Sequence, residues 1–363
     1  MNDYLYQKAT VYMEGGDLVR AEKWYKKLLK VQPNHPEACL NYGAMKKNRF
    51  DLKGALALFK RCLIDKPNWA FPYNNIGLIY HNWNMEQAAV PYFRRAIELD
   101  SEYADAHWNL ALSLLKTGYS TMDMDLIAEG WMHYSWRFKK SGPVTLAVVP
   151  SLPIYESAKP GRCLVVAEQG FGDVIMMLPY LEDNMTVYTD GRFAELFDSL
   201  GIRWTSTVEG FDSWIPMMSL AAFGRRRIVE PKWVGGRQLG VCWAGNKEHG
   251  NDINRSRAPS DFHWLGNAKS FQFGVSDKHF GVCCTNSWSD SVRELLSVRA
   301  LVTVDTSIAH LAGHLGVPTC VLVPSIDTDF RWGLVRNDCF WYPSVFVARN
   351  MQEVKKYVNS LSS

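Results

Sequence analysis

A 34-residue period runs through the first third of the chain and limits what that part can fold into. Small residues recur at this interval in two series, Ala9, Gly43, Gly77 and Ala111, and Ala21, Ala55 and Ala89. Aromatic residues follow the second series at Tyr25, Phe59 and Phe93, and the repeats end at Pro33, Pro67 and Ser101. This period predicts stacked helix pairs, in which small residues let the helices approach and each pair covers the apolar face of the next.

The period, the small residues at the helix crossing and the closing proline together resemble the tetratricopeptide repeat. A fourth repeat is expected to be irregular. Its first helix is predicted over residues 105–116, an insertion over 118–125 and its second helix over 126–140.

Residues 301–318, LVTVDTSIAHLAGHLGVP, predict a buried strand, a turn, and a helix that ends at Gly316. The free N–H groups and the positive dipole end at the start of that helix favour an anion, usually a phosphate. His310 follows Ser307 by three residues, so both lie on one face of the first turn. A plain strand-to-helix connection with a core histidine is the alternative.

A second strand, turn and helix are predicted over residues 165–181, VVAEQGFGDVIMMLPYL. Gly170 and Gly172 permit close approach of the backbone, and Asp173 lies at the start of the helix, where capping is its simpler role. The third glycine of the dinucleotide-binding fingerprint is missing. Two such units far apart in the sequence predict two α/β lobes with a small-molecule site between them.

Four segments carry a further resemblance: AEQGFGDV, CWAGNKEHGNDINRSR, VDTSIAHLAGHLG and DFRWGLVRNDCFWYPS. In this order they resemble the C-terminal half of bacterial tetratricopeptide-repeat proteins related to the heptosyltransferases of glycosyltransferase family 9. The resemblance implies a GT-B fold, with two Rossmann-like lobes that follow the helical solenoid of repeats. It also implies a nucleotide-diphosphate sugar donor on the second lobe and an acceptor on the first. Only about 75 residues separate Gly161 from Gly236, so the acceptor lobe is shortened.

Transferred residue by residue, the resemblance implies that Asp173, preceded by Gly172, is the general base. It implies that the diphosphate binds at Asp305, Thr306, Ser307 and His310. The remaining donor-binding candidates are Trp243, Gly245, Asn246, Arg255 and Ser256, with Arg255 as a phosphate clamp. Gln169 and Arg331 are further candidates. The segment GWMHYSWRF at 130–138 resembles the element that closes the repeats in this family, and we expect it to dock on the transferase part with its aromatic side chains in the core and interface.

No metal and no cofactor besides the nucleotide-sugar co-substrate are expected. Asp123 and Asp125 form one Asp-x-Asp triplet, which we interpret as a solvated loop within the repeats. A second triplet ends at Asp329 and belongs to the Asp-aromatic-Arg-Trp element of the resemblance. His310 and His314 have the spacing of a zinc-protease motif, but the glutamate of that motif is absent.

Four parts of the chain are predicted: repeats over 1–140, a linker over 141–160, a first lobe over 161–235 and a second lobe over 236–363. The linker follows from Pro143, Pro150, Pro153 and Pro160, which exclude a long helix. Gly235 and Gly236 predict a hinge between the lobes. Residues 350–363 predict a helix that packs back on the first lobe.

The net charge of +3 does not demand a nucleic-acid partner. A basic cluster is interpreted as a solvated segment between the lobes rather than a contact to acceptor phosphates; its members are Arg225, Arg226, Arg227, Lys232 and Arg237.

The eight cysteines suggest no disulfide framework, and five are predicted to be buried thiols, namely Cys39, Cys62, Cys163, Cys242 and Cys320. Without a signal peptide or a membrane-length apolar run, a cytoplasmic location is expected.

Two functions from different classes remain. The first is a metal-independent, inverting glycosyltransferase whose repeats recruit the acceptor, a protein or a glycan, with modified DNA left open. The second is a non-catalytic tetratricopeptide scaffold with a degenerate nucleotide-binding domain. The joint presence of Asp173, Arg255, Asp305, Thr306 and His310 favours the first, and the short acceptor lobe favours the second.

Overall fold

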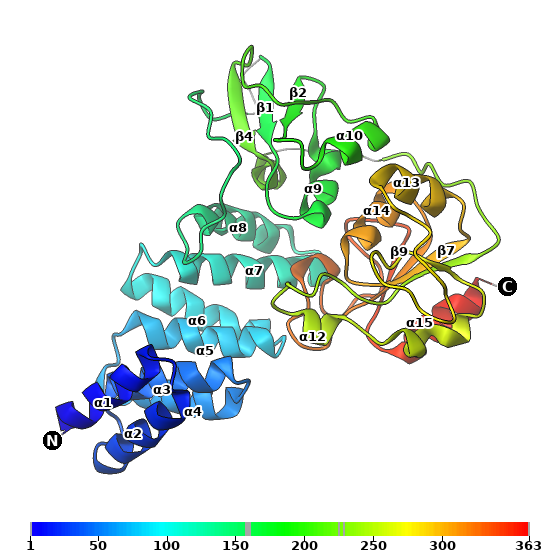
Figure 1. Ribbon diagram of the computed structural model, residues 1–363. Helices are drawn as coiled ribbons and strands as arrows, with labels where there is room; N and C mark the ends of the chain where they lie inside the picture. The colour runs from blue at the N-terminus through cyan, green and yellow to red at the C-terminus, as the bar shows by residue number, and fades with distance from the viewer. Residues whose placement is uncertain (1, 157–160, 224–225, 228, 362–363) are drawn as a thin grey trace. The chain divides into compact units, whose positions relative to one another are not determined.

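The computed structural model describes residues 2–156, 161–223, 226–227 and 229–361. Pro160 of the predicted linker and Arg225 of the predicted basic cluster lie outside these residues. The chain divides into two compact units, whose helices and strands are labelled in Figure 1. One extends to Leu114 and includes Lys139–Ser141, and the other combines Leu115–Phe138 with the residues from Gly142 onward. The last part of the repeats therefore belongs to the unit that holds both α/β lobes.

The first unit is a solenoid of antiparallel helix pairs. Its helices are α1 (Asn2–Glu14), α2 (Leu18–Val31), α3 (Pro36–Asn48), α4 (Leu52–Asp65), α5 (Ala70–Asn82), α6 (Glu86–Leu99) and the first part of α7 (Ala104–Thr121). A Cβ atom on Gly43 would lie 2.6 Å from the Phe59 ring, and one on Gly77 would lie 2.6 Å from the Phe93 ring. Small residues therefore let the paired helices approach, as the period predicts.

The predicted insertion over residues 118–125 is wrong. Helix α7 continues to Thr121, and only Met122 and Asp123 separate it from α8 (Met124–Tyr134). Gly118 makes this tight connection possible, because a Cβ atom there would lie 2.7 Å from Ile127. The Asp123 carboxylate caps α8, which is followed by a short turn of 3-10 helix, η1 (Ser135–Phe138), instead of continuing to residue 140.

The first lobe is a parallel sheet in the order β3-β2-β1-β4. Its strands are β1 (Cys163–Val166), β2 (Met185–Tyr188), β3 (Trp204–Thr205) and β4 (Ser213–Pro216). Its helical elements are α9 (Phe171–Met177), η2 (Leu178–Tyr180), α10 (Ala194–Leu200), η3 (Met217–Ser219) and α11 (Leu220–Phe223). The central strand β1 is buried along its whole length, which explains its continuous apolar sequence.

The predicted linker packs on this lobe over its described part. The Tyr155 N–H donates to the Trp214 carbonyl at 2.8 Å, and the Trp214 N–H donates to the Pro153 carbonyl at 3.0 Å. Leu146, Val148 and Leu152 pack on the cluster that contains Trp214. The segment thus extends the edge of the sheet beside β4 and is not a free linker.

The second lobe is a five-stranded parallel sheet in the order β6-β5-β7-β8-β9. Its strands are β5 (Leu239–Cys242), β6 (Lys269–Ser270), β7 (Ala300–Val304), β8 (Thr319–Leu322) and β9 (Val345–Ala348). Its helical elements are α12 (Asp252–Arg255), η4 (Pro259–Leu265), α13 (Trp288–Leu296), α14 (Ser307–Leu315), η5 (Phe330–Trp332) and α15 (Met351–Ser360). The predicted fold class, repeats followed by two Rossmann-like α/β lobes with a small first lobe, is confirmed.

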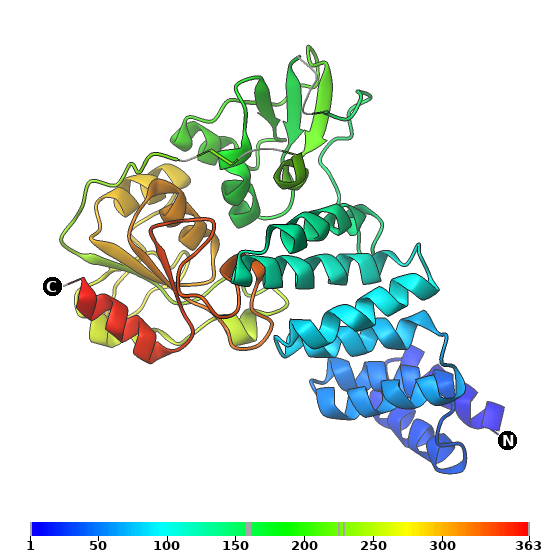
Figure 2. The ribbon, with the colours of Figure 1, turned by 180° about the vertical axis from the view of Figure 1, so that it is seen from behind.

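The C-terminal helix corrects another prediction. Helix α15 packs on β8 and β9 of its own lobe and not on the first lobe, as Figure 2 shows from behind. Val354 is buried in the same core as Val304 and Leu322, and Tyr357 stacks on Phe346 at 5.2 Å. The apolar residues of α15, which recur every three or four positions, therefore cover the sheet that the chain has just completed.

The five cysteines predicted to be buried thiols are free and buried. No helix within the described residues is both long and apolar enough to cross a bilayer.

Gly236 is packed so closely on Ser297 that a Cβ atom would lie 2.0 Å from the Ser297 carbonyl oxygen. Close approach therefore explains this glycine, and a hinge at Gly235–Gly236 stays a prediction.

Candidate functional site

A cavity of about 1160 Å³ lies at the carboxyl ends of β1, β5 and β7. Loops that follow parallel strands commonly form ligand sites at this edge. The first lobe contributes Gly170–Asp173, and the second contributes Gly245, Asn246 and Arg255 together with Asp305, Thr306, Ser307, His310 and Arg331. Most of the residues singled out in the sequence are thus brought together from separate segments.

Asp173 lies in the first turn of α9 and has two partners. Its Oδ2 accepts a hydrogen bond from the Gly170 N–H at 2.9 Å, which is the helix-capping role. Its Oδ1 pairs with the Arg331 guanidinium. The capping interpretation therefore holds, and the same carboxylate also lines the cavity.

Arg331 joins carboxylates from both lobes. Besides Asp173, its guanidinium pairs with Asp329, whose Oδ1 also accepts the Arg331 backbone N–H at 2.9 Å. Burial opposes the charge on Arg331, but Asp173 and Asp329 outweigh it and raise the pKa of Arg331. Burial likewise opposes ionisation of Asp329, but Arg331 lowers the pKa of Asp329 overall. The further candidate Arg331 is thus the central cation of the site.

The start of α14 forms the opposite wall. Thr306 is the N-cap residue, with an extended backbone and no side-chain hydrogen bond to the helix. Thr306, Ser307 and Ile308 line the cavity, so the first-turn N–H groups lie at its surface. Burial raises the pKa of the adjacent Asp305, and the Asp329 carboxylate raises it further. The predicted anion site has the required helix end, with one carboxylate beside it.

His310 both lines the cavity and belongs to the core. It is 4% exposed, and its Nδ1 lies 2.9 Å from the Tyr342 hydroxyl. A Cβ atom on Gly172 would lie 2.8 Å from His310 Cδ2, so glycine at this position allows α9 to approach α14. Burial and the Arg331 charge lower the pKa of His310 to about 3, which keeps the imidazole neutral at physiological pH.

The lowered pKa of His310 predicts a pH dependence of stability. Between pH ~6.5 and ~3 the unfolded histidine binds a proton that the folded one does not, so the free energy of unfolding falls as pH falls. His310→Asn should remove a slope of up to about 1.4 kcal/mol per pH unit in this window. Urea unfolding of both proteins at several pH values measures the difference, and equal slopes would contradict the assignment.

The loop after β5 holds Arg255 beside the cavity. A Cβ atom on Gly245 would lie 2.3 Å from the Arg255 guanidinium, so the arginine lies directly over this glycine. The Ser256 hydroxyl accepts from the Gly245 N–H at 2.9 Å and donates to Asp252 at 2.6 Å. Ser256 therefore shapes the loop and is not on the cavity wall.

Two more candidates lie away from the cavity wall. Trp243 is 3% exposed and stacks on Phe280 in the core of the second lobe, with ring centroids 5.7 Å apart. Gln169 has a left-handed backbone with φ of 65°, and its amide exchanges hydrogen bonds with the Tyr134 hydroxyl. Both residues support the loops that carry the site.

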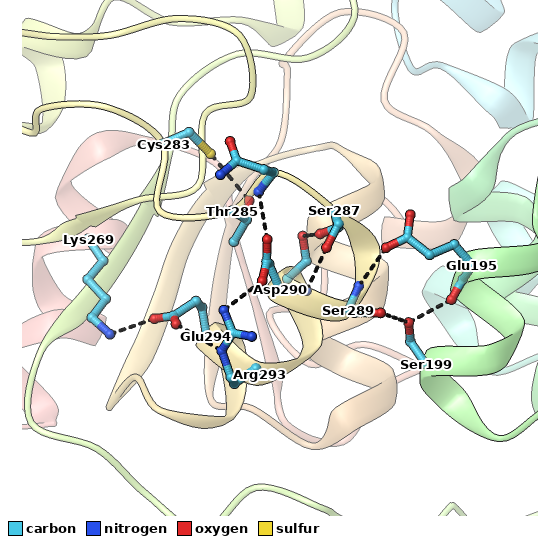
Figure 3. Close-up of polar contacts among 12 residues, drawn as sticks. Glu195, Ser199, Lys269, Cys283, Thr285, Ser287, Ser289, Asp290, Arg293 and Glu294 are labelled. Atoms are coloured by element: carbon cyan, nitrogen blue, oxygen red, sulfur yellow. Dashed lines mark hydrogen bonds and ion pairs between the residues drawn. The ribbon is translucent and has the colours of Figure 1, made fainter.

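Sequence reasoning missed the contact between α10 and α13, which Figure 3 shows in close-up. The Ser199 and Ser289 hydroxyls lie 2.8 Å apart, and Glu195 accepts the Ser289 N–H at 3.2 Å. Beside them Phe171 and Trp288 pack with ring centroids 4.7 Å apart and line the cavity. Ser287, the N-cap residue of α13, indicates the start of a helix in the sequence, but no sequence pattern near it indicates that α13 packs on α10.

The segment GWMHYSWRF docks on the lobes, as expected. Trp131 and Tyr134 are buried against Phe330. Arg137 forms a two-pronged ion pair with Glu168, at 2.7 and 3.0 Å, with side chains 1% and 0% exposed. Because Glu168 lies two residues after the end of β1, this pair fixes the start of the segment that leads to Asp173.

Comparison with known proteins identifies the repeats. The tetratricopeptide repeat family matches residues 3–35 and 72–103. No curated protein matches the sequence. Among solved structures, the chain is similar to one described as the crystal structure of MamA protein. The two share 26% sequence identity over 37% of this chain and 70% of that chain, with a TM-score of 0.33. An O-GlcNAc transferase mutant from Thermobaculum terrenum is 13% identical, over 99% of this chain and 89% of that chain, with a TM-score of 0.39. The N-terminal repeats are therefore tetratricopeptide repeats.

Proposed function

We propose that the unit with the two lobes is a glycosyltransferase that moves a sugar from a nucleotide-diphosphate donor to an acceptor hydroxyl. The observation that supports this most is the placement of Asp173, from one lobe, on the same cavity as the start of α14 and Arg255, from the other. Such a cavity can hold a carboxylate base on one side of a reacting carbon and donors for a leaving diphosphate on the other.

On the donor side, the diphosphate binds at the start of α14. The first-turn N–H groups, the Ser307 hydroxyl and the helix dipole stabilise its charge, and the Arg255 guanidinium clamps it. Negative charge develops on this group as the sugar leaves, so donors already in place favour the transition state. In this proposal, guanidinium and N–H groups stabilise the negative charge of the leaving diphosphate, a role that a metal ion has in other transferases.

On the acceptor side, Asp173 takes the proton from the acceptor hydroxyl as its oxygen attacks the anomeric carbon. The new carbon–oxygen bond forms on the face opposite the breaking bond to the diphosphate, so the configuration inverts. The ion pair with Arg331 holds the Asp173 carboxylate at the cavity wall, where the acceptor hydroxyl would bind. The repeats recruit the acceptor, a protein or a glycan, along the helical surface of the solenoid.

A nucleotide panel tests the donor site. UDP, GDP, ADP, CDP and TDP are added to the full-length protein, and thermal unfolding is followed. A nucleotide at ~100 times its dissociation constant adds roughly 2.7 kcal/mol, which raises the melting temperature by a few degrees. We expect one or more of the five to do so, and Arg255→Ala to abolish the shift.

Arg257→Ala is the matched control, because Arg257 is two residues away, exposed and not part of the cavity wall. It should leave the nucleotide shift unchanged. If no nucleotide shifts the wild-type protein, the donor site is refuted and the non-catalytic scaffold becomes the better account. Partner capture with the repeats would then be the next experiment.

A further inference from the structure

A second cavity of about 220 Å³ lies apart from the proposed donor site. Its wall includes Arg226, Arg227, Pro231, His314, Trp341 and Ser344, none of which lines the large cavity. His314 is one helical turn beyond His310 on α14, and it lies on the wall of this second cavity. Three members of the predicted basic cluster, Arg226, Arg227 and Lys232, also gather here.

The cavity is built by close contacts at the end of α14. The N–H groups of Lys232 and Trp233 donate to the Leu315 carbonyl, at 3.0 and 3.2 Å. Gly316 ends the helix with a φ of 77°, and a Cβ atom there would lie 2.6 Å from Pro231. A Cβ atom on Gly313 would lie 2.4 Å from the Tyr342 side chain. The two glycines thus allow the walls of this cavity to approach the helix.

Buried polar atoms without partners gather at this cavity. His314 is 9% exposed, and within the described residues its Nδ1 has no hydrogen-bond partner. The same holds for Ser344 Oγ, Trp341 Nε1 and Arg226 Nε. Buried polar atoms are almost always satisfied, by protein, water or a ligand. Four residues of this cavity wall thus carry a buried polar atom without a partner, so the wall is polar as well as apolar.

The charge and shape of the wall define that molecule. Arg226 and Arg227 are cationic, and no described residue on the wall is acidic. Pro179, Val229 and Pro231 provide apolar surface beside them. The volume of about 220 Å³ accommodates roughly seven to eleven non-hydrogen atoms at about 20–30 Å³ each. A bare inorganic ion would leave the apolar wall without a partner, and a neutral hydrocarbon would leave the guanidinium groups without one.

We propose that this second cavity binds a small organic carboxylate, with its apolar body against the prolines and Val229 and its carboxylate toward Arg227 and His314. Arg227 is the exposed partner, since its side chain is half exposed and its guanidinium bonds Asp183 at 3.0 Å on the surface. Arg226 is held by the carbonyls of Phe340 and Trp341 and provides fixed charge.

A hydrogen bond joins a residue of the second cavity to a residue of the large one. Tyr342 lines the second cavity, and its hydroxyl lies 2.9 Å from Nδ1 of His310, which lines the large cavity. A carboxylate that shifts Tyr342 therefore changes the position of the imidazole beside the proposed diphosphate site. This regulatory role rests on the proposed function, whereas the binding itself does not.

Benzoate is the probe for binding, and benzyl alcohol is its neutral counterpart. Saturation-transfer NMR and calorimetry on the full-length protein, without nucleotide, should show saturable benzoate binding with a dissociation constant in the millimolar range. Benzyl alcohol should bind at least about tenfold more weakly, because it lacks the charge that the arginines recognise. Arg227→Gln should weaken benzoate about tenfold, and Val229→Trp, which fills the cavity, should abolish binding.

Asp183→Asn is the control, since it removes the surface partner of Arg227 and leaves the cavity intact; benzoate affinity should stay the same or rise. The proposal is overturned if benzoate does not saturate below about 10 mM, or binds Val229→Trp as tightly as wild type. Regulation is tested separately, with a nucleoside diphosphate from the panel. Benzoate should change its dissociation constant in the wild type and not in Tyr342→Phe, and an unchanged constant in both would refute the regulatory role alone.

Discussion

Asp173→Asn is expected to lower the rate of sugar transfer by about 10²–10⁴-fold while nucleoside diphosphate affinity changes little. The amide cannot take a proton from the acceptor hydroxyl, but it still offers an oxygen to the Gly170 N–H that the carboxylate now caps. The diphosphate contacts come from α14 and Arg255, so donor binding should survive. Transfer kinetics and calorimetric titration, measured on the same protein samples, separate the two effects.

The control for this substitution is Asp190→Asn, an exposed carboxylate on the same lobe, which should transfer at the wild-type rate. Because Asp173→Asn also removes an ion pair with Arg331, thermal unfolding must show that the variant is folded. An Asp173→Asn protein that transfers sugar at a rate near wild type would reduce Asp173 to the cap of α9.

Loss of the Glu168 carboxylate is expected to destabilise the unit with the two lobes by about 3–5 kcal/mol. Glu168 is fully buried and neutralises Arg137, and its Oε1 also accepts the Met218 N–H at 2.9 Å. In Glu168→Ala a guanidinium remains in a site with no counter-charge, and the N–H loses its acceptor. Urea unfolding, followed by a probe of this unit, measures the loss.

A second variant distinguishes charge burial from a simple packing defect. Arg137→Met combined with Glu168→Leu removes both charges and keeps apolar volume, so it should recover most of the stability that Glu168→Ala loses. If the double variant is less stable than Glu168→Ala, packing explains the loss. A Glu168→Ala protein within about 1 kcal/mol of wild type would show that the pair contributes little.

Local signals in the sequence predict much of this fold. The spacing of Gly43 and Gly77 gives the helix crossings, since each glycine faces an aromatic ring 16 residues later in the partner helix. The turn at Asp305–Ser307 and the stop at Gly316 define α14 almost to the residue. These features depend on caps, turns and apolar spacing, which neighbours in the sequence determine.

Features that depend on the assembled core were not predictable in this way. The apolar stripe of α15 shows that it covers a sheet, but not which one. Gly118 was assigned to a predicted loop, but it lies within α7. It allows α7 to approach Ile127 of α8, and this contact exists only when the two helices are packed together.

The candidate site shows the same division. Arg255 and Thr306 follow β5 and β7, whose carboxyl ends lie at one edge of the second sheet, and Asp173 follows β1 of the first sheet. The ion pair of Arg331 with Asp173 joins residues 158 positions apart, and no local pattern links them. Trp243 and Ser256 belong to the same motifs as the cavity residues, but their side chains stabilise the core and the loop, so the motif alone could not separate binding from support.

The central claim is that a nucleotide diphosphate binds where α14 begins, opposite Asp173. The most direct test is a crystal structure of the full-length protein with the nucleoside diphosphate that the panel identifies. The account predicts diphosphate oxygens within hydrogen-bond distance of the first-turn N–H groups of α14 and of Arg255, with the Asp173 carboxylate facing the space beyond the terminal phosphate. A diphosphate bound away from the start of α14, or a nucleotide whose terminal phosphate points away from Asp173, would contradict it.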